Sequence, residues 1–139
     1  MVEWRGGQIE TILSLLKPTR STPVKILDSV SIDPGSSSEF TIKNMEGYSA
    51  IVVTVKATYN ASASAGVRVR WLYSPDNTNF DSPEDADDQG NYEDLTFSAG
   101  ATRQRSILIP IFAPYVKVQI VNKDTSYGVT VDAWYTLIR

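Results

Sequence analysis

The chain has 139 residues, a hydrophobic fraction of 42%, a charged fraction of 21% and a formal net charge of -3, which fits one globular domain. It contains neither cysteine nor histidine, which excludes disulfides, thiolate metal sites and histidine-dependent catalysis. Its apolar stretches are too interrupted by charge for a membrane span, and its weak charge gives no electrostatic reason to bind nucleic acid.

The N-terminal region predicts a short amphipathic helix over residues 8 to 17. Four apolar side chains recur at i, i+3, i+4 and i+7, which is the spacing of one helix stripe, and Pro18 ends the pattern. Such a helix either plugs an open end of its own core or docks as an arm onto a neighbouring subunit. The pattern has no continuous apolar stretch of the kind found in signal peptides. The stripe consists of Ile9, Ile12, Leu13 and Leu16.

From residue 24 onward the apolar period changes to two, which is typical of β-strands with one buried face. Turn-forming stretches such as Asp33-Pro34-Gly35 separate the candidate strands. Eight short strands without intervening helices favour an all-β fold, an antiparallel sandwich resembling a jelly roll. We therefore expect an N-terminal arm over residues 1 to 22 and one sandwich domain over 23 to 139. The candidate strands are 24 to 32, 38 to 44, 48 to 59, 66 to 74, 93 to 98, 103 to 111, 115 to 122 and 128 to 139.

In two of the expected strands, the alternation of side-chain direction predicts one buried tryptophan and one that faces outward. Trp71 shares a face with Val67 and Val69, which indicates a core residue. Trp134 falls on the opposite face from Ala133 and Tyr135 and therefore points outward. Tryptophan is enriched at binding hot spots and also stacks on sugar rings, so Trp134 is a candidate contact residue.

Leu108 is the second candidate contact residue outside the arm. It lies opposite Ile107 and Ile109, which makes both faces of this strand apolar. Such a strand is either covered on both sides or part of a subunit interface.

The stretch from Asp76 to Asp94 holds eight of the sixteen acidic residues and no basic residue. A calcium loop of the EF-hand type beginning at Asp85 would need a glutamate at its twelfth position, where the chain has Thr96. We therefore expect the segment from Asp81 to Asp94 to be a solvated loop that binds calcium weakly or not at all. The same carboxylates offer many pairs for glycoside hydrolysis, but no apolar pocket that would raise a carboxyl pKa is evident.

No sequence motif for covalent or nucleotide-dependent catalysis is present. The chain has no G-x-S-x-G elbow, no P-loop and no dinucleotide-binding glycine pattern. The sequence therefore predicts a protein that is not an enzyme and needs no cofactor.

Two stretches resemble phage-encoded β-sandwich proteins. VRVRWLYSPDNTNFDS is similar to a strand and turn of that group, and APYVKVQIVNKDTSYGVTVDAWYTLIR is similar to its closing hairpin. The resemblance covers about the last half of the chain and implies a virion component, such as a capsid decoration, tail or fibre subunit, that works as a homotrimer with other virion proteins. Sugar-binding sandwich domains share these motifs.

The sequence is therefore compatible with three functions. The first is a virion structural protein that assembles through Ile9, Ile12, Leu13, Leu16, Leu108 and Trp134. The second is a carbohydrate-binding module that uses Trp134 or Tyr92 as a platform for a host-surface glycan. The third is a small glycosidase.

Overall fold

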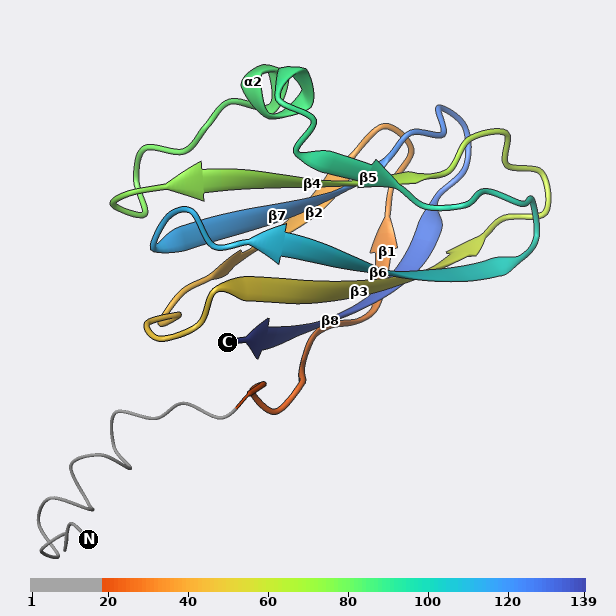
Figure 1. The fold of residues 1–139 in the computed structure, drawn as a ribbon. Helices are drawn as coiled ribbons and strands as arrows, with labels where there is room; N and C mark the ends of the chain where they lie inside the picture. The colour runs from red at the N-terminus through yellow and green to blue at the C-terminus, as the bar shows by residue number, and fades with distance from the viewer. Residues whose placement is uncertain (1–18) are drawn as a thin grey trace, which may run out of the picture.

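The computed structural model describes residues 19 to 139, which form eight β-strands and one short helix (Figure 1). The helix predicted over residues 8 to 17 lies outside the described residues, as do Ile9, Ile12, Leu13 and Leu16. Within the described part of the chain, no helix has the length and apolar character needed to cross a membrane. The elements are β1 (Val24–Ile32), β2 (Ser37–Ile42), β3 (Ala50–Tyr59), β4 (Val67–Ser74), α2 (Pro83–Asp88), β5 (Tyr92–Asp94), β6 (Thr102–Pro110), β7 (Tyr115–Asn122) and β8 (Val129–Ile138).

The strands form two antiparallel four-stranded sheets with the orders β1-β8-β3-β6 and β2-β7-β4-β5. The pairing is nested, because the first strand pairs with the last and so on inward: β1 with β8, β2 with β7, β3 with β6 and β4 with β5. This is the order of a long hairpin rolled into two layers, the jelly roll. The all-β sandwich predicted from the sequence is confirmed.

The core lies between the two sheets and follows the alternation of the strands. On β3, Ile51, Val53 and Val55 are fully buried, and the residues between them face outward. β3 has hydrogen-bonded neighbours on both sides, β8 and β6, so its inward side chains lie in the middle of the core. Trp71 is 7% exposed, which confirms that it is a core residue.

The acidic segment differs from the predicted solvated loop. Residues Pro83–Asp88 form α2, which starts after Ser82, whose hydroxyl accepts a 3.1 Å hydrogen bond from the amide of Asp85. The proline at the first helical position costs no hydrogen bond there. Ala86 is fully buried as α2 packs on β4, so the expectation of a wholly solvated loop is wrong. The strand expected over 93 to 98 is also shorter and ends with β5 at Asp94.

At the opposite end of the sandwich, the buried carboxylate of Asp124 joins two loops. Asp124 is 1% exposed and accepts four backbone N–H hydrogen bonds, from Ser64, Ala65, Ser126 and Tyr127 at 2.7 to 3.1 Å. These donors hold the pKa of the Asp124 carboxyl well below its usual range, the bond from Ser64 most strongly. The carboxylate therefore ties the β3–β4 loop to the β7–β8 loop.

Candidate functional site

The structure brings Leu108 and Trp134 to one surface, the outer face of the β1-β8-β3-β6 sheet. Leu108 pairs with Val52, which pairs with Thr136. In the adjacent row, Thr54 pairs with Trp134. We call these five outward residues, Val52, Thr54, Leu108, Trp134 and Thr136, the Trp134 face.

Leu108 is the most exposed large aliphatic side chain among those the structure describes, with 66% of its surface open. Its neighbours Ile107 and Ile109 are buried in the core. Within residues 19 to 139, no further layer of the fold covers Leu108.

Trp134 is half-buried because Lys25 on β1 lies over its ring, with the ammonium nitrogen 5.0 Å from the ring centroid. The ammonium is also 3.0 Å from Asp28 and 3.4 Å from Asp132. The pKa of Lys25 is raised, mainly by its bond to Asp28. The pKa of Asp132 is lowered, mainly by a bond from the amide of Ser29. An aromatic ring bordered by charged groups is typical of the centre and rim of a protein interface.

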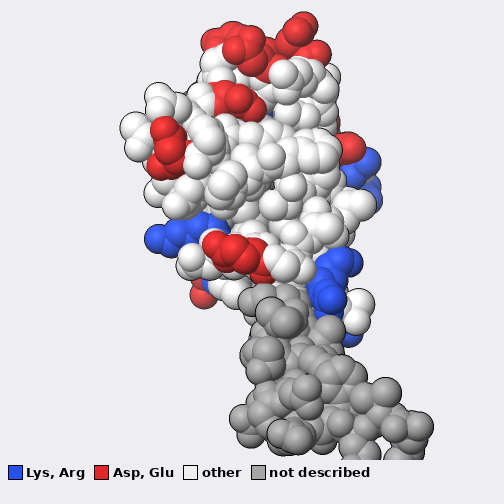
Figure 2. Space-filling view, turned by 60° about the vertical axis from the view of Figure 1, so that its left-hand side comes forward, with Lys and Arg blue, Asp and Glu red and all other residues white. Residues whose placement is uncertain are grey.

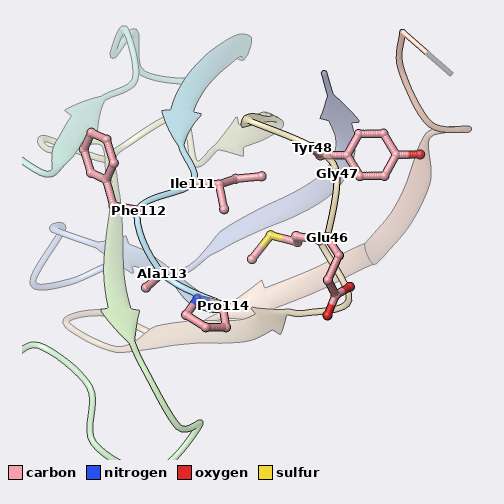
Figure 3. A pocket seen from close by; sticks show the side chains of 8 residues that line it. Glu46, Gly47, Tyr48, Ile111, Phe112, Ala113 and Pro114 are labelled. Atoms are coloured by element: carbon pink, nitrogen blue, oxygen red, sulfur yellow. The ribbon is translucent and has the colours of Figure 1, made fainter. Parts of the chain in front are cut away.

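A pocket opens at the end of the sandwich where the β2–β3 and β6–β7 loops meet. Its volume is about 440 Å³, and Phe112 at its rim is 78% exposed. Figure 3 shows Phe112 on one side of the pocket, Glu46 and Tyr48 on the other and Ile111 between them. Among the described residues that line it, Glu46 alone is charged. The lining residues are Met45, Glu46, Gly47, Tyr48, Ile111, Phe112, Ala113 and Pro114.

Figure 2 shows this end of the molecule and the distribution of its charged side chains. Acidic side chains gather at the top, over α2, and a broad surface without charge lies below them.

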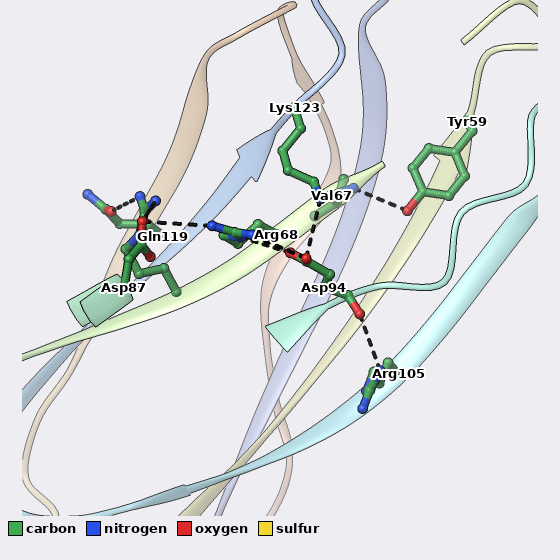
Figure 4. A network of polar contacts seen from close by, with 9 residues as sticks. Tyr59, Val67, Arg68, Asp87, Asp94, Arg105, Gln119 and Lys123 are labelled. Carbon is green, nitrogen blue, oxygen red and sulfur yellow. Dashed lines mark hydrogen bonds and ion pairs between the residues drawn. The ribbon is translucent and has the colours of Figure 1, made fainter. Parts of the chain in front are cut away.

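The acidic segment is held against the outer face of β4 by two arginines (Figure 4). Arg70 donates two hydrogen bonds of 2.8 Å to the carboxylate of Asp87 and a third, of 3.2 Å, to Gln119. Arg68 forms a similar pair with Asp94, at 2.8 and 3.2 Å. Bidentate pairs of this kind are the strongest ion pairs that arginine makes with a carboxylate.

These arginines also lower the pKa values of the two carboxylates that they bind, Asp87 and Asp94. The pKa of Asp87 is lowered mainly by its bonds from Arg70, and that of Asp94 mainly by its bonds from Arg68. Both carboxylates are thus ionised and already paired with cations. Among the described residues, no three carboxylates lie close enough together to hold a metal ion.

Tyr92, the other candidate sugar platform, also carries an arginine on its ring. The guanidinium carbon of Arg68 lies 4.0 Å from the ring centroid. A sugar can therefore stack only on the opposite face of this ring, and the same limit applies to Trp134 beneath Lys25.

Sequence reasoning missed both the pocket and the role of Asp124. The pocket residues come from two loops that are about 65 residues apart in the chain, and nothing in either loop indicates the other. Comparison with known proteins adds no relative, because no protein-family model matches the chain and no curated protein is significantly similar to it.

Proposed function

We propose that this chain is a non-enzymatic structural protein of a virion, which coats or extends a larger particle through association of its own copies, as a homotrimer. The observation that carries this proposal is the Trp134 face, where Trp134 and the exposed Leu108 share one sheet surface with a charged rim. A jelly-roll sandwich is one of the architectures that capsid proteins use. The fold alone does not select this function, so the proposal depends on the surface.

The physical basis of the proposal is the chemistry of this face. Large apolar side chains in a polar surround give most of the binding free energy at subunit interfaces. The rim charges Lys25 and Asp132 already pair with each other, so a partner that covers this face does not bury an isolated charge.

Sedimentation of Trp134→Ala over a series of protein concentrations tests the proposal. Truncation of an aromatic anchor costs about 2 kcal/mol or more, so the dissociation constant of the assembly should rise about thirtyfold. Leu108→Lys should weaken assembly in the same direction, because it places a charge in the apolar part of the face. Tyr127→Ala removes an exposed aromatic side chain elsewhere and is the matched control. Unchanged assembly in both face variants would contradict the proposal.

The second candidate is a carbohydrate-binding module, since lectins also use jelly rolls. The observation that favours it is that the exposed Phe112 ring and the carboxylate of Glu46 line opposite sides of one pocket, a combination that suits a sugar ring and its hydroxyl groups. Retention on a glycan matrix that is lost in Trp134→Ala or Phe112→Ala, with assembly unchanged, would favour this candidate over the first.

A further inference from the structure

We infer that the pocket lined by the β2–β3 and β6–β7 loops is the docking site for the N-terminal segment of the same chain, residues 9 to 17. This inference does not rest on the proposed virion role, because it concerns contacts within one copy.

The first argument is where the described chain begins. Arg20 forms a β-bridge with Ile138 at the end of β8, and the amide of Arg139 donates a 3.0 Å hydrogen bond to the carbonyl of Thr19. On the other side of β8, the amide of Ser49 donates to the carbonyl of Ile138 at 2.8 Å, and the amide of Ile111 donates to the carbonyl of Ser49 at 2.9 Å. Backbone hydrogen bonds thus connect the start of the described chain to the pocket.

The second argument is reach. The path from Arg20 across Ile138 to Ser49, the neighbour of the pocket residue Tyr48, covers two strand spacings, about 10 Å. The carbonyl of Thr19 is bonded to Arg139, so the three residue steps from Leu16 to Thr19 are available, and they span up to about 10 Å when extended. Leu16 can therefore reach the pocket without displacing any strand, and the rest of the apolar stripe follows it.

The third argument is chemistry. The stripe Ile9, Ile12, Leu13 and Leu16 needs an apolar partner surface, and the pocket offers Met45, Tyr48, Ile111, Phe112 and Pro114. Directly after the stripe comes Lys17, which complements Glu46. Within residues 19 to 139, Glu46 forms no ion pair.

Only a few residues join the N-terminal segment to the described part of the chain. This short connection favours docking of the chain's own segment over docking of the same segment from another copy. A segment held this close has an effective concentration of the order of millimolar at the pocket. A second copy must compete with that concentration and also lose its translational freedom.

Because the chain contains no cysteine, a pair of introduced cysteines can report the contact in the full-length protein. The test variant carries Leu13→Cys and Phe112→Cys, and the control carries Leu13→Cys and Thr125→Cys, since exposed Thr125 lies at the far end of the sandwich. Under mild oxidation, the test variant should form an intrachain disulfide at least about tenfold faster than the control. Non-reducing gels and mass spectrometry distinguish intrachain from interchain bonds.

Equal rates in the two variants would overturn the inference, because the segment would then not favour the pocket. Interchain disulfides would also overturn it and would assign the segment to another copy. If Phe112→Cys lowers the melting temperature, Glu46→Cys on the opposite rim replaces it. A charge exchange gives an independent test on the Leu13→Cys and Phe112→Cys background: Glu46→Lys should slow the disulfide, and adding Lys17→Glu should restore its rate. Failure of this restoration would contradict the pairing of Lys17 with Glu46.

Discussion

The hydroxyl of Tyr73 donates a 2.6 Å hydrogen bond to the main-chain carbonyl of Pro110, and this bond joins β4 of one sheet to the end of β6 in the other. The ring of Tyr73 also packs against Phe112, with the ring centroids 5.6 Å apart. The link therefore lies next to the pocket and fixes the β6–β7 loop that forms one of its walls.

We expect Tyr73→Phe to lower the free energy of unfolding by about 1 kcal/mol, because the ring stays while its one hydroxyl bond to the backbone is lost. Urea denaturation measures this change. Tyr115→Phe, which changes a half-buried tyrosine at the start of β7, is the control and should change stability less. An unaltered midpoint in Tyr73→Phe would show that the bond does not hold the sheets together.

Alkaline pH should destabilise the protein through the same residue. Burial raises the pKa of Tyr73 to about 12, whereas a tyrosine in an unfolded chain ionises near pH 10. The folded state therefore holds this proton more tightly, so the resulting stability is complete below pH 10 and is lost as the pH rises from about 10 to 12. Melting temperatures across this range should fall less steeply in Tyr73→Phe than in the parent protein.

Acid should also destabilise the protein, through the carboxylates that accept hydrogen bonds from backbone amides. Amide donors, with that of Asn79 first, lower the pKa of Asp76 to about 2, and the pKa of Asp124 is lowered further. Folded-state pKa values below the unfolded value near 4 give stability that is present above pH 4 and lost as the pH falls toward 2. Asp124→Asn should lower the melting temperature at pH 7 and flatten its decline in acid. A decline as steep as that of the parent would exclude Asp124 as a main contributor.

Loss of the Arg70–Asp87 pair should detach the acidic segment from β4. We expect Arg70→Ala to cost about 1.5 kcal/mol of stability, near the lower end for hydrogen bonds to charged groups, because Asp87 is partly exposed. The double variant with Asp87→Ala should cost little more than Arg70→Ala alone. Arg103→Ala, at an exposed position on β6, should change stability by less than about 0.5 kcal/mol. Additive losses in the double variant would show that the two side chains act independently.

Calcium should bind the segment from Asp81 to Asp94 no more tightly than about millimolar. Two of its carboxylates, Asp87 and Asp94, already accept bidentate hydrogen bonds from arginines, and a metal would have to replace these partners. Calorimetric titration of the calcium-free protein measures the affinity. Micromolar binding, together with a lower melting temperature after chelation, would contradict this expectation.

The sequence by itself determined the class of fold and most of the strands. An apolar period of two is imposed by the alternation of side chains along a strand, so it identified β3, β7 and β8 within two residues at either end and placed Trp71 inside and Trp134 outside. It failed at β5 and α2, where only three and six residues form each element. In such short elements the local pattern is weak, and contacts with Arg68 and Arg70 on β4 decide the conformation.

Only the tertiary structure decided which of these residues meet. The order of strands in the two sheets places Leu108 and Trp134 on one face although they lie 26 positions apart in the chain. The same folding surrounds Asp124 with amides from two loops and forms the pocket from two others. Strand alternation specifies which way a side chain points, but its neighbours across a sheet are set by pairing between distant segments, and that pairing depends on how the whole core packs.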